Sequence, residues 1–225
     1  MYRCRLASIP VPRQIQPDND LTWQVIDVCE RLSSVALLIG VTPILAGSAL
    51  AISLLSGRTP FIAHKRVGWR GATLWMFKLR TMWSDECPQA SQRSRWVEYI
   101  EDEAGPSQKQ AGDPRVPNAF ARFCRRHSID ELPQLWHVIA GEMALVGPRP
   151  VTPAELREHY GAGAESILEV KPGIAGLWQV SGRNRLTYSQ RRDFDADFVR
   201  RRSLGMYVRI VLRTIPEVLR GAHSW

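Results

Sequence analysis

The longest apolar stretch of the chain runs over residues 32–55, where Leu, Ile, Val and Ala dominate and no charged residue occurs. Arg31 precedes this stretch and Arg58 follows it closely. As a straight helix with a rise of about 1.5 Å per residue, it would reach about 36 Å, which exceeds the roughly 30 Å hydrocarbon core of a bilayer. The pattern therefore predicts a helix that enters a membrane.

Pro43 lies near the centre of this apolar stretch. Proline removes a backbone donor and clashes with the preceding turn, so it kinks or breaks a helix. Each half would then reach only about 16–18 Å, about half of a bilayer. We therefore predict a re-entrant membrane helix hairpin over residues 21–58, hinged at Pro43. Basic residues on both flanks favour two ends on the same side, and the alternatives are a kinked transmembrane helix or a buried pair of soluble helices.

The polar remainder of the chain divides into two parts. Residues 1–20 are rich in Pro, Arg and Gln without periodicity, which indicates a mobile leader. Residues 59–225 are long enough to bury a core as one further domain. Within them, apolar and basic residues alternate between residues 61 and 82, which predicts short strands joined by a turn at Arg70-Gly71.

Helical patterns follow this small β element, so the predicted fold class is α+β and predominantly α. The polar segment 84–114 is interpreted as a loop around a short helix near residues 94–99. Further helices are predicted over residues 120–126, 131–140 (ending at Gly141), 154–160 and 165–170. Residues 188–219 are amphipathic and rich in arginine, so they can lie in an anionic membrane interface or cover a core with a solvated basic face.

Composition points to an anionic partner. The 30 Lys and Arg residues exceed the 22 Asp and Glu residues, which gives a formal net charge of +8. Phospholipids, nucleotides and nucleic acid all satisfy this charge. The eight tryptophans fall largely beside basic residues, a mixture that suits a membrane interface. The four cysteines lack CxxC spacing, which indicates neither a zinc site nor a disulfide framework and favours a reduced, cytoplasm-facing body.

The adjacent acids Asp130 and Glu131 lie where a helix is predicted to begin. Asp130 would lie at or next to the N-cap, with Pro133 in the first turn; alternatively, Ser128 caps the helix and Glu131 closes a capping box. In both arrangements the helix dipole and free N–H groups favour an ionised acid and also favour phosphate. Such a carboxylate can attack phosphorus as a nucleophile or hold Mg²⁺.

An anionic nucleophile and a phosphate repel each other unless cations lie between them. The candidates for this charge stabilisation are Lys78, Arg80, Arg125, Arg126 and Arg149. By itself, an acid pair in a first helical turn is usually only a cap. Its occurrence together with the proline-flanked Arg149 and the membrane segment favours chemistry on a phosphorylated substrate at a lipid surface.

These features, taken in order, resemble the bacterial sugar transferases, the monotopic phosphoglycosyl transferases that begin lipid-linked glycan assembly. The resemblance covers roughly residues 21–221. It rests on the apolar segment with its central proline and on the motifs His64-Lys65-Arg66-Val67-Gly68, Phe77-Lys78-Leu79-Arg80-Thr81-Met82, Asp113-Pro114-Arg115, Ser128-Ile129-Asp130-Glu131-Leu132-Pro133-Gln134-Leu135, Gly147-Pro148-Arg149-Pro150, Lys171-Pro172-Gly173-Ile174-Ala175-Gly176 and Gln179-Val180-Ser181-Gly182-Arg183-Asn184.

The resemblance implies a reaction and a set of roles. Asp130 would attack the sugar-bearing phosphate of a UDP-sugar and expel UMP, and the phosphosugar would then pass to polyprenyl (undecaprenyl) phosphate. Mg²⁺ would lie near Asp130 and the diphosphate, and Glu131 would act as a base or as an organiser of metal and protons. Lys78, Arg80, Arg126 and Arg149 would contact phosphate, and Arg183 would contact the nucleotide or a phosphate.

The resemblance also implies a location. Residues 59–225 would form a cytoplasmic catalytic core surrounded by amphipathic interfacial helices, on the cytoplasmic face of the bacterial inner membrane. The expected partners are a UDP-sugar, polyprenyl phosphate and membrane phospholipids, without nucleic acid, and a homo-oligomer stays open. The expected pathway is exopolysaccharide or other glycan biosynthesis.

Two rival hypotheses have different origins. The charge and a helix-turn-helix-like pattern over residues 120–140 suggest a non-enzymatic basic adaptor for anionic membranes or nucleic acid, although a DNA binder would not need residues 32–55. An inactive relative that scaffolds glycan assembly is the other, and the intact acid pair argues against it.

Overall fold

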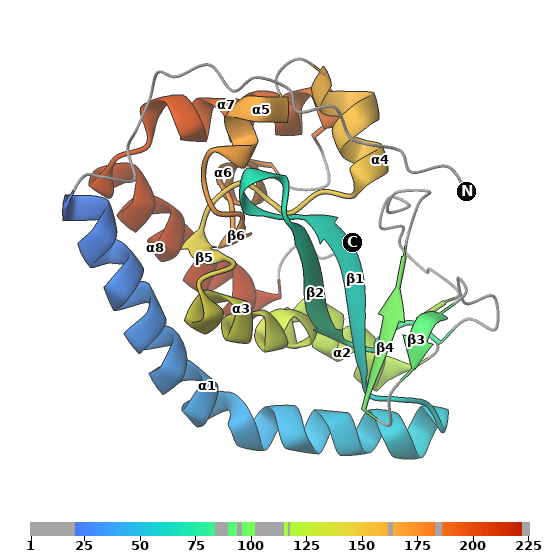
Figure 1. Ribbon diagram of the computed structural model, residues 1–225. Helices are drawn as coiled ribbons and strands as arrows, with labels where there is room; N and C mark the ends of the chain where they lie inside the picture. The colour runs from blue at the N-terminus through green and yellow to red at the C-terminus, as the bar shows by residue number, and fades with distance from the viewer. Residues whose placement is uncertain are drawn as a thin grey trace.

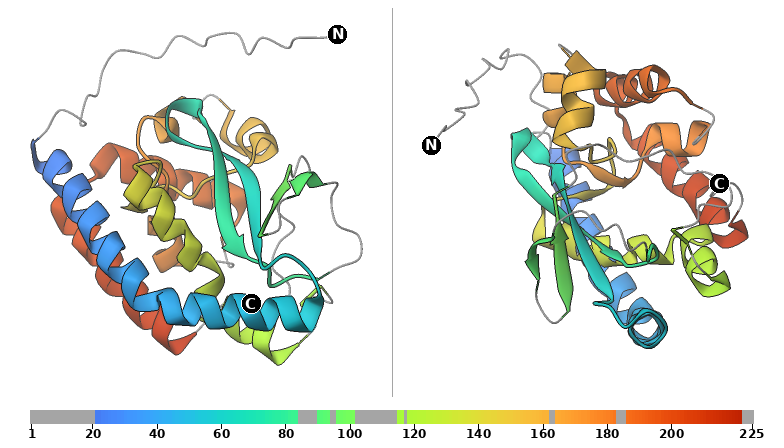
Figure 2. Two further views of the ribbon diagram at one scale, coloured as in Figure 1. Left: turned by 60° about the horizontal axis from the view of Figure 1, so that its bottom comes forward. Right: turned by 90° about the vertical axis from the view of Figure 1, so that its right-hand side faces the viewer.

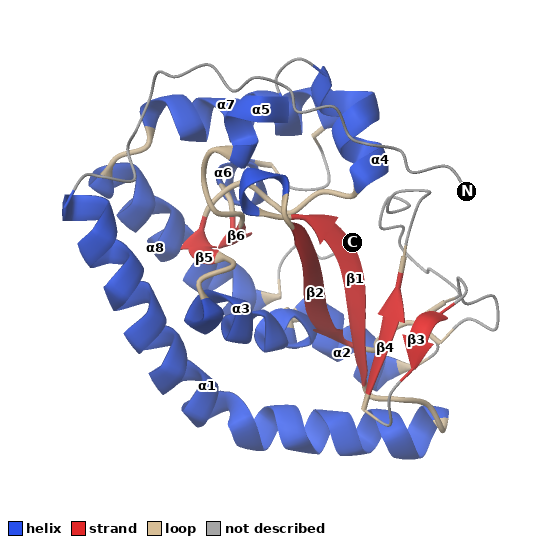
Figure 3. Cartoon of the chain, in the orientation of Figure 1, coloured by secondary structure: helices blue, strands red, loops and turns tan. Residues whose placement is uncertain are grey.

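The computed structural model describes residues 21–83, 90–93, 96–101, 115–116, 118–161, 164–182 and 186–221. The predicted leader, residues 1–20, and Arg183 lie outside this part of the chain. Helices surround two small sheets, so the described part has the predicted α+β, predominantly helical class (Figure 3).

The apolar stretch lies in α1 (Leu21–Ser56), one helix that continues through Pro43. It bends near its middle, and both arms curve around the rest of the protein (Figure 1). Two local features favour the bend. Pro43 has no N–H to donate to the carbonyl of Ile39, and Thr42 Oγ1 donates a 2.7 Å hydrogen bond to the carbonyl of Leu38.

One face of α1 packs against the body, and its buried residues are Glu30, Ser34, Ser48 and Ile52. The other sides are apolar and exposed, with Leu32, Val35, Leu37, Ile39, Ile44, Leu50, Leu54 and Leu55 all exposed. Among the described residues, α1 is the one helix long and apolar enough to cross a membrane. The apolar helix is thus confirmed, as a continuous bent helix, and its re-entrant topology stays a prediction.

A four-stranded sheet follows, in the order β2-β1-β4-β3. The antiparallel pair β1 (Phe61–Val67) and β2 (Thr73–Leu79) is joined by the short 3₁₀ turn η1 (Trp69–Gly71), as predicted. Within the turn, Arg70 and Gly71 have φ values of 55° and 79°, so this is where the chain needs the left-handed region.

The other two strands correct the prediction for the polar segment. β4 (Val97–Ile100) pairs parallel with β1, and β3 (Ala90–Arg93) pairs antiparallel with β4. The short helix predicted near residues 94–99 is therefore wrong. The physical reason is a long-range one, because β4 lies in register with β1, with Val97 opposite Phe61, and a four-residue strand gives little local pattern.

The predicted helices on either side of the acid pair are present. They are α2 (Ala119–Arg126), the 3₁₀ helix η2 (Ile129–Gln134) and α3 (Leu135–Ala140). α3 ends at Gly141, whose φ of 79° suits a left-handed C-cap, as predicted.

The rest of the body surrounds a second, two-stranded sheet that was not predicted. Its elements are β5 (Ala144–Val146), α4 (Pro153–Glu155), the π-helix η3 (Leu156–Tyr160), α5 (Ala164–Leu168), β6 (Gly173–Ala175), α6 (Leu177–Ser181), α7 (Tyr188–Arg201) and α8 (Leu204–Arg220). β5 and β6 are parallel. A cluster of Val146, Val170, Phe198, Val199 and Ile210 forms the core beside them.

The basic segment 188–219 forms two helices, α7 and α8. α8 has an apolar face that stays exposed, formed by Leu204, Val208, Leu212, Ile215 and Leu219. This spacing of three and four residues places all five on one side of the helix. Figure 2 shows α8 running alongside the first arm of α1. The exposed apolar face of α8 therefore belongs to a helix that lies next to α1.

Candidate active site

The acid pair lies on η2, at the turn between α2 and α3. Ser128 precedes η2 with a left-handed φ of 55°, and Glu131 N donates a 3.1 Å hydrogen bond to Ser128 O. Ser128 occupies the N-cap position but makes no side-chain cap hydrogen bond, so the expected capping box is not formed, and Asp130 lies within the first turn of η2 and not at its cap. Pro133 cannot donate a backbone hydrogen bond, and the α-helical pattern begins only at Leu135.

Glu131 joins two of the predicted cations. Its Oε1 accepts hydrogen bonds from Lys78 Nζ at 3.1 Å and from Arg149 Nη2 at 3.3 Å. These side chains come from β2, from η2 and from the loop after β5, three segments far apart in the sequence. The side chains of Lys78 and Glu131 are 15% and 14% exposed and that of Arg149 is 29% exposed, so the cluster opens to solvent on the Arg149 side.

The charges in this cluster influence one another. Burial lowers the pKa of Lys78 below its ordinary value, and the nearby positive charge of Arg149 acts in the same direction. The negative charges of Glu131 and Asp130 oppose this shift. Asp130 is itself buried, at 6% exposure. The site therefore brings two carboxylates and two cations together where water screens their charges poorly.

Cys124 and Ser48 were not predicted as site residues, yet Cys124 interacts with Asp130, and Ser48 contacts Cys124. Burial, and then the charge of Asp130, raise the pKa of the Cys124 thiol to about 11, while a hydrogen bond with Ser48 lowers it. Ser48 belongs to the second arm of α1. The apolar helix α1 thus packs close to η2, which carries the acid pair, and the sequence signal for the Ser48 contact is its position within the apolar stretch, on the same helix face as Ile52.

Two other predicted phosphate ligands, Arg80 and Arg126, have different partners, and a third, Arg183, is not described. Arg80 is buried with Glu98, and Nη2 of Arg80 lies 2.7 Å from Oε2 of Glu98. Arg126 is exposed at the end of α2, and its Nε donates a 3.2 Å hydrogen bond to the carbonyl of Gly221. Arg183 lies outside the described residues. For all three residues, phosphate binding stays a prediction.

A second buried acid, Asp195 on α7, was also missed. Tyr160 donates its hydroxyl to Asp195 Oδ2 at 3.0 Å, and within the described part of the chain Oδ1 has no hydrogen-bond partner. Burial raises the pKa of Asp195 to about 7, while its Tyr160 hydrogen bond and the charges of Arg149 and Arg191 oppose the rise. In sequence, Asp195 looked like one more polar residue of an arginine-rich helix.

The donor set at the acid pair can be tested against magnesium. Among the described residues, no group of three or more His, Cys, Asp or Glu side chains is placed to hold a metal ion. Mg²⁺ that binds with a phosphate substrate uses only one or two carboxylates, and phosphate oxygens and water complete its shell. Asp130 alone could supply such a carboxylate, and Mg²⁺ binding at Asp130 stays a prediction. The residues fit Mg²⁺ carried with a diphosphate.

The arrangement defines a class of protein. A carboxylate pair held against cations suits a phosphorylated substrate, and the adjoining apolar helix fits a membrane location. The comparison with known families agrees, since the bacterial sugar transferase model matches residues 21–221. The chain belongs to the bacterial sugar transferase family, and it is an enzyme that transfers phosphorus-containing groups.

Curated relatives extend over much of the chain. The exopolysaccharide production protein ExoY of Sinorhizobium fredii is 37% identical over 213 residues, which cover 94% of this chain and 91% of the relative. The undecaprenyl-phosphate galactose phosphotransferase of Salmonella typhimurium is 37% identical over 172 residues, 73% of this chain and 34% of the relative. The UDP-glucose:undecaprenyl-phosphate glucose-1-phosphate transferase of Xanthomonas campestris is 32% identical over 228 residues, 96% of this chain and 43% of the relative.

Proposed function

We propose that this chain transfers a sugar-1-phosphate from a UDP-sugar to polyprenyl phosphate, as the first membrane step of exopolysaccharide assembly. The observation that carries the proposal is the buried pair Asp130 and Glu131, with Lys78 and Arg149 bound to Glu131 and the second arm of α1 beside Asp130. The activities that the names of the Salmonella and Xanthomonas relatives give support a UDP-sugar as donor and undecaprenyl phosphate as acceptor.

The transfer has two steps, and Asp130 acts as the nucleophile in the first. In the first, a carboxylate oxygen of Asp130 attacks the sugar-bearing phosphorus. The bond from that phosphorus to the bridging oxygen breaks, and UMP leaves with the electron pair. In the second, an oxygen of polyprenyl phosphate attacks the same phosphorus, the bond to Asp130 breaks, and the carboxylate is restored.

The neighbouring residues stabilise charge during both steps. Lys78 and Arg149 face the phosphate oxygens, where they offset the charge that two anionic reactants bring together. Glu131 holds both cations in place through one oxygen. When bound at Asp130 and the diphosphate, Mg²⁺ would neutralise phosphate charge and favour departure of the leaving group.

The molecule would lie in the inner membrane with the acid pair at the cytoplasmic face, and the exposed apolar surfaces of α1 and α8 support this location. α1 is bent at Pro43, so its two arms can lie in one leaflet and return both ends to the same side. The exposed apolar face of α8 would lie in the interface beside the first arm of α1. Arg209 and Arg213, on the same helix, suit anionic phospholipid headgroups.

The variant Asp130→Asn tests the reaction. With Mg²⁺, polyprenyl phosphate and a panel of UDP-sugars, the wild-type protein should release UMP with one of them, and Asp130→Asn should release none. Without the acceptor, the wild-type protein should gain the mass of one sugar-1-phosphate, and the variant should not. Asp193→Asn, which alters an exposed carboxylate bound to the neighbouring Arg192, serves as the control. Full turnover by Asp130→Asn would refute the nucleophile assignment.

Membrane association separates this proposal from the adaptor hypothesis. A membrane enzyme held by α1 should be released by detergent and retained in high salt, both in the wild-type protein and in Asp130→Asn. A basic adaptor held by charge should be released by salt instead. Release by salt, together with absence of UMP formation, would favour the adaptor.

A further inference from the structure

Two acids near the start of α1 face the body of the protein. Asp27 and Glu30 are three residues apart, so they lie on the same side of the helix. Glu30 is only 4% exposed, and its Oε1 accepts three hydrogen bonds. The donors are Leu145 N at 2.9 Å, Val146 N at 3.4 Å and the Tyr207 hydroxyl at 2.8 Å. One side chain of the membrane helix is thus bonded to strand β5 and to α8.

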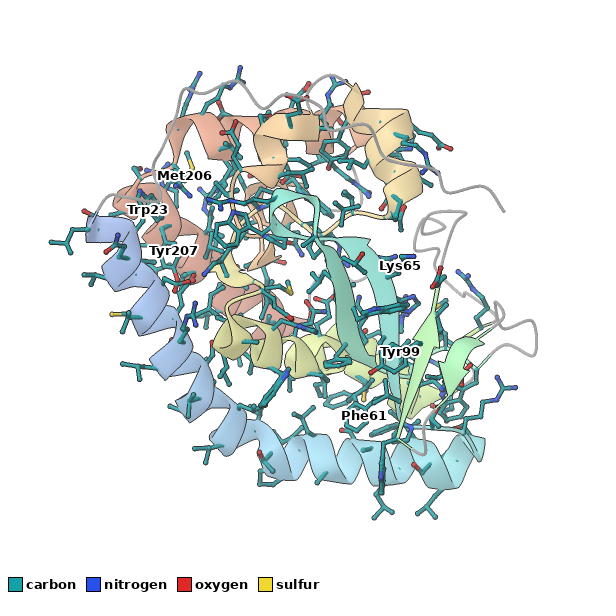
Figure 4. The ribbon with its side chains drawn as sticks, viewed as in Figure 1. Trp23, Phe61, Lys65, Tyr99, Met206 and Tyr207 are labelled. Carbon is teal, nitrogen blue, oxygen red and sulfur yellow. The ribbon has the colours of Figure 1, made fainter. Side chains whose placement is uncertain are left out.

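Asp27 makes a similar contact just before β6, the other strand of this sheet. Its carboxylate pairs with Lys171, which lies two residues before β6, and with Arg31 Nε at 2.9 Å. A cavity of about 310 Å³, lined by Asp27, Glu30, Lys171 and Tyr207 among others, lies between α1 and the sheet. Figure 4 shows Tyr207 close to Trp23 at this end of α1. The polar contacts of Asp27 and Glu30 thus connect α1 to the segment before β6, to β5 and to α8.

The small sheet leads directly from these contacts to the active site. Gly147 N donates to Ala175 O at 2.9 Å, and Gly173 N donates to Pro148 O at 2.8 Å. The two backbones approach so closely that a Cβ added to Gly147 would lie 2.5 Å from the carbonyl oxygen of Lys171. The next residue after Pro148 is Arg149, whose guanidinium binds Glu131. The chain from β5 to that guanidinium therefore has little freedom.

We propose that Glu30 is a positioning residue. Through β5 it fixes the loop that carries Arg149, so that the position of α1 against the body determines the geometry of the active site. The proposal rests on the transferase function proposed above. Glu30 touches neither Glu131 nor Arg149 in the structure. It acts by fixing the backbone amides of Leu145 and Val146, four and three residues before Arg149.

The variant Glu30→Ala removes the acceptor, and Glu30→Gln keeps an oxygen that can accept from the same amides. Glu30→Ala should lower kcat for UMP release at least about tenfold, because small displacements of a catalytic group are costly. The KM for the UDP-sugar should change less, and Glu30→Gln should recover most of the loss. Amide hydrogen exchange at residues 145–147 should become faster in Glu30→Ala only. Glu101→Ala, which removes an exposed carboxylate on the other sheet, should change none of these.

A double-mutant cycle on kcat tests whether Glu30 acts through Arg149. If Glu30 acts through Arg149, then Glu30→Ala should add little to the loss that Arg149→Ala already causes. Losses that multiply in the double variant would overturn the proposal, and so would a Glu30→Ala variant with unchanged exchange at residues 145–147. The exchange measurement needs no turnover. If the wild-type protein released no UMP while exchange still responded to Glu30→Ala, the proposed function would fail and the structural link would stand.

Discussion

Arg80 and Glu98 form a buried ion pair between the end of β2 and β4, and removing Glu98 should strongly destabilise the fold. The side chains are 2% and 8% exposed, and Arg80 Nη2 lies 2.7 Å from Glu98 Oε2. Arg80 also donates from Nε to Thr59 O at 2.8 Å and from Nη2 to Thr59 Oγ1 at 3.0 Å. Glu98→Ala would remove this carboxylate from a guanidinium that is buried and held by Thr59.

The expected cost follows from this geometry. Breaking a buried pair by removing one partner costs about 3–5 kcal/mol, a large part of the roughly 5–15 kcal/mol that holds a typical domain folded. At roughly 2–4 °C per kcal/mol for a chain of this size, Glu98→Ala should lower the Tm by roughly 6–20 °C. Thermal unfolding of the protein in lipid nanodiscs, followed by near-UV circular dichroism, measures this change.

An exposed pair on the same sheet supplies the matched control. Lys65 Nζ lies 3.1 Å from Glu101 Oε2, but these side chains are 35% and 42% exposed. Glu101→Ala should therefore cost no more than about 1 kcal/mol. If Glu98→Ala lowered the Tm no further than Glu101→Ala does, burial of the pair would not have the assigned consequence.

A paired replacement then tests the phosphate contact predicted for Arg80. Arg80→Met combined with Glu98→Leu removes both charges and should recover most of the stability lost in Glu98→Ala. If this double variant folds and releases UMP at the wild-type rate, Arg80 does not contact phosphate during the reaction. A folded variant without UMP release would support the contact.

Three further predictions concern charge and backbone space. Burial lowers the pKa of Lys78, so the rate of UMP release should fall at alkaline pH, below the ordinary lysine pKa of 10.5. In Lys78→Arg this alkaline fall in rate should move to higher pH. An unchanged pH profile in that variant would contradict the role of Lys78. The pKa of Asp195 in the folded protein is raised to about 7, so ionisation of this group lowers the stability of the fold as pH rises from about 4 to 7. Above pH 7, Asp195→Asn should be more stable than the wild type by up to about 4 kcal/mol. A Tm difference between the two proteins that does not depend on pH would refute this prediction. Gly147→Ala should destabilise by about 1–3 kcal/mol because its Cβ would meet the Lys171 carbonyl, whereas Gly205→Ala, with nothing within 4 Å, should be tolerated in the same unfolding assay.

Local patterns were sufficient for several elements. The alternation over residues 61–82 and the glycine at its turn predicted β1 and β2, and Gly141 predicted the end of α3. These features depend on residues close together in the chain. The helix predicted near residues 94–99 failed because β4 exists through its parallel pairing with β1. Pairing between distant segments leaves little trace in a short local pattern.

The candidate site was predicted in part. The acid pair and its cations Lys78 and Arg149 do meet, as the sequence suggested from residue types and order. Arg80, expected beside them, lies in a buried pair with Glu98. The sequence could not assign this pair, because an arginine two residues from Lys78 can bind a phosphate or a carboxylate. Which anion it meets depends on where β4 lies.

By itself, the sequence determined that the chain has an apolar helix with Pro43 near its centre, an acid pair after α2 and enough basic residues for an anionic substrate. These features depend on composition and on spacing along the chain, so they can be recognised without knowledge of the fold. Only the tertiary structure decided that Ser48 reaches the surroundings of Asp130, and that Glu30 connects α1 to the strand before Arg149. A buried polar side chain needs partners, and in these cases the partners come from segments far along the chain that only folding brings within hydrogen-bonding distance.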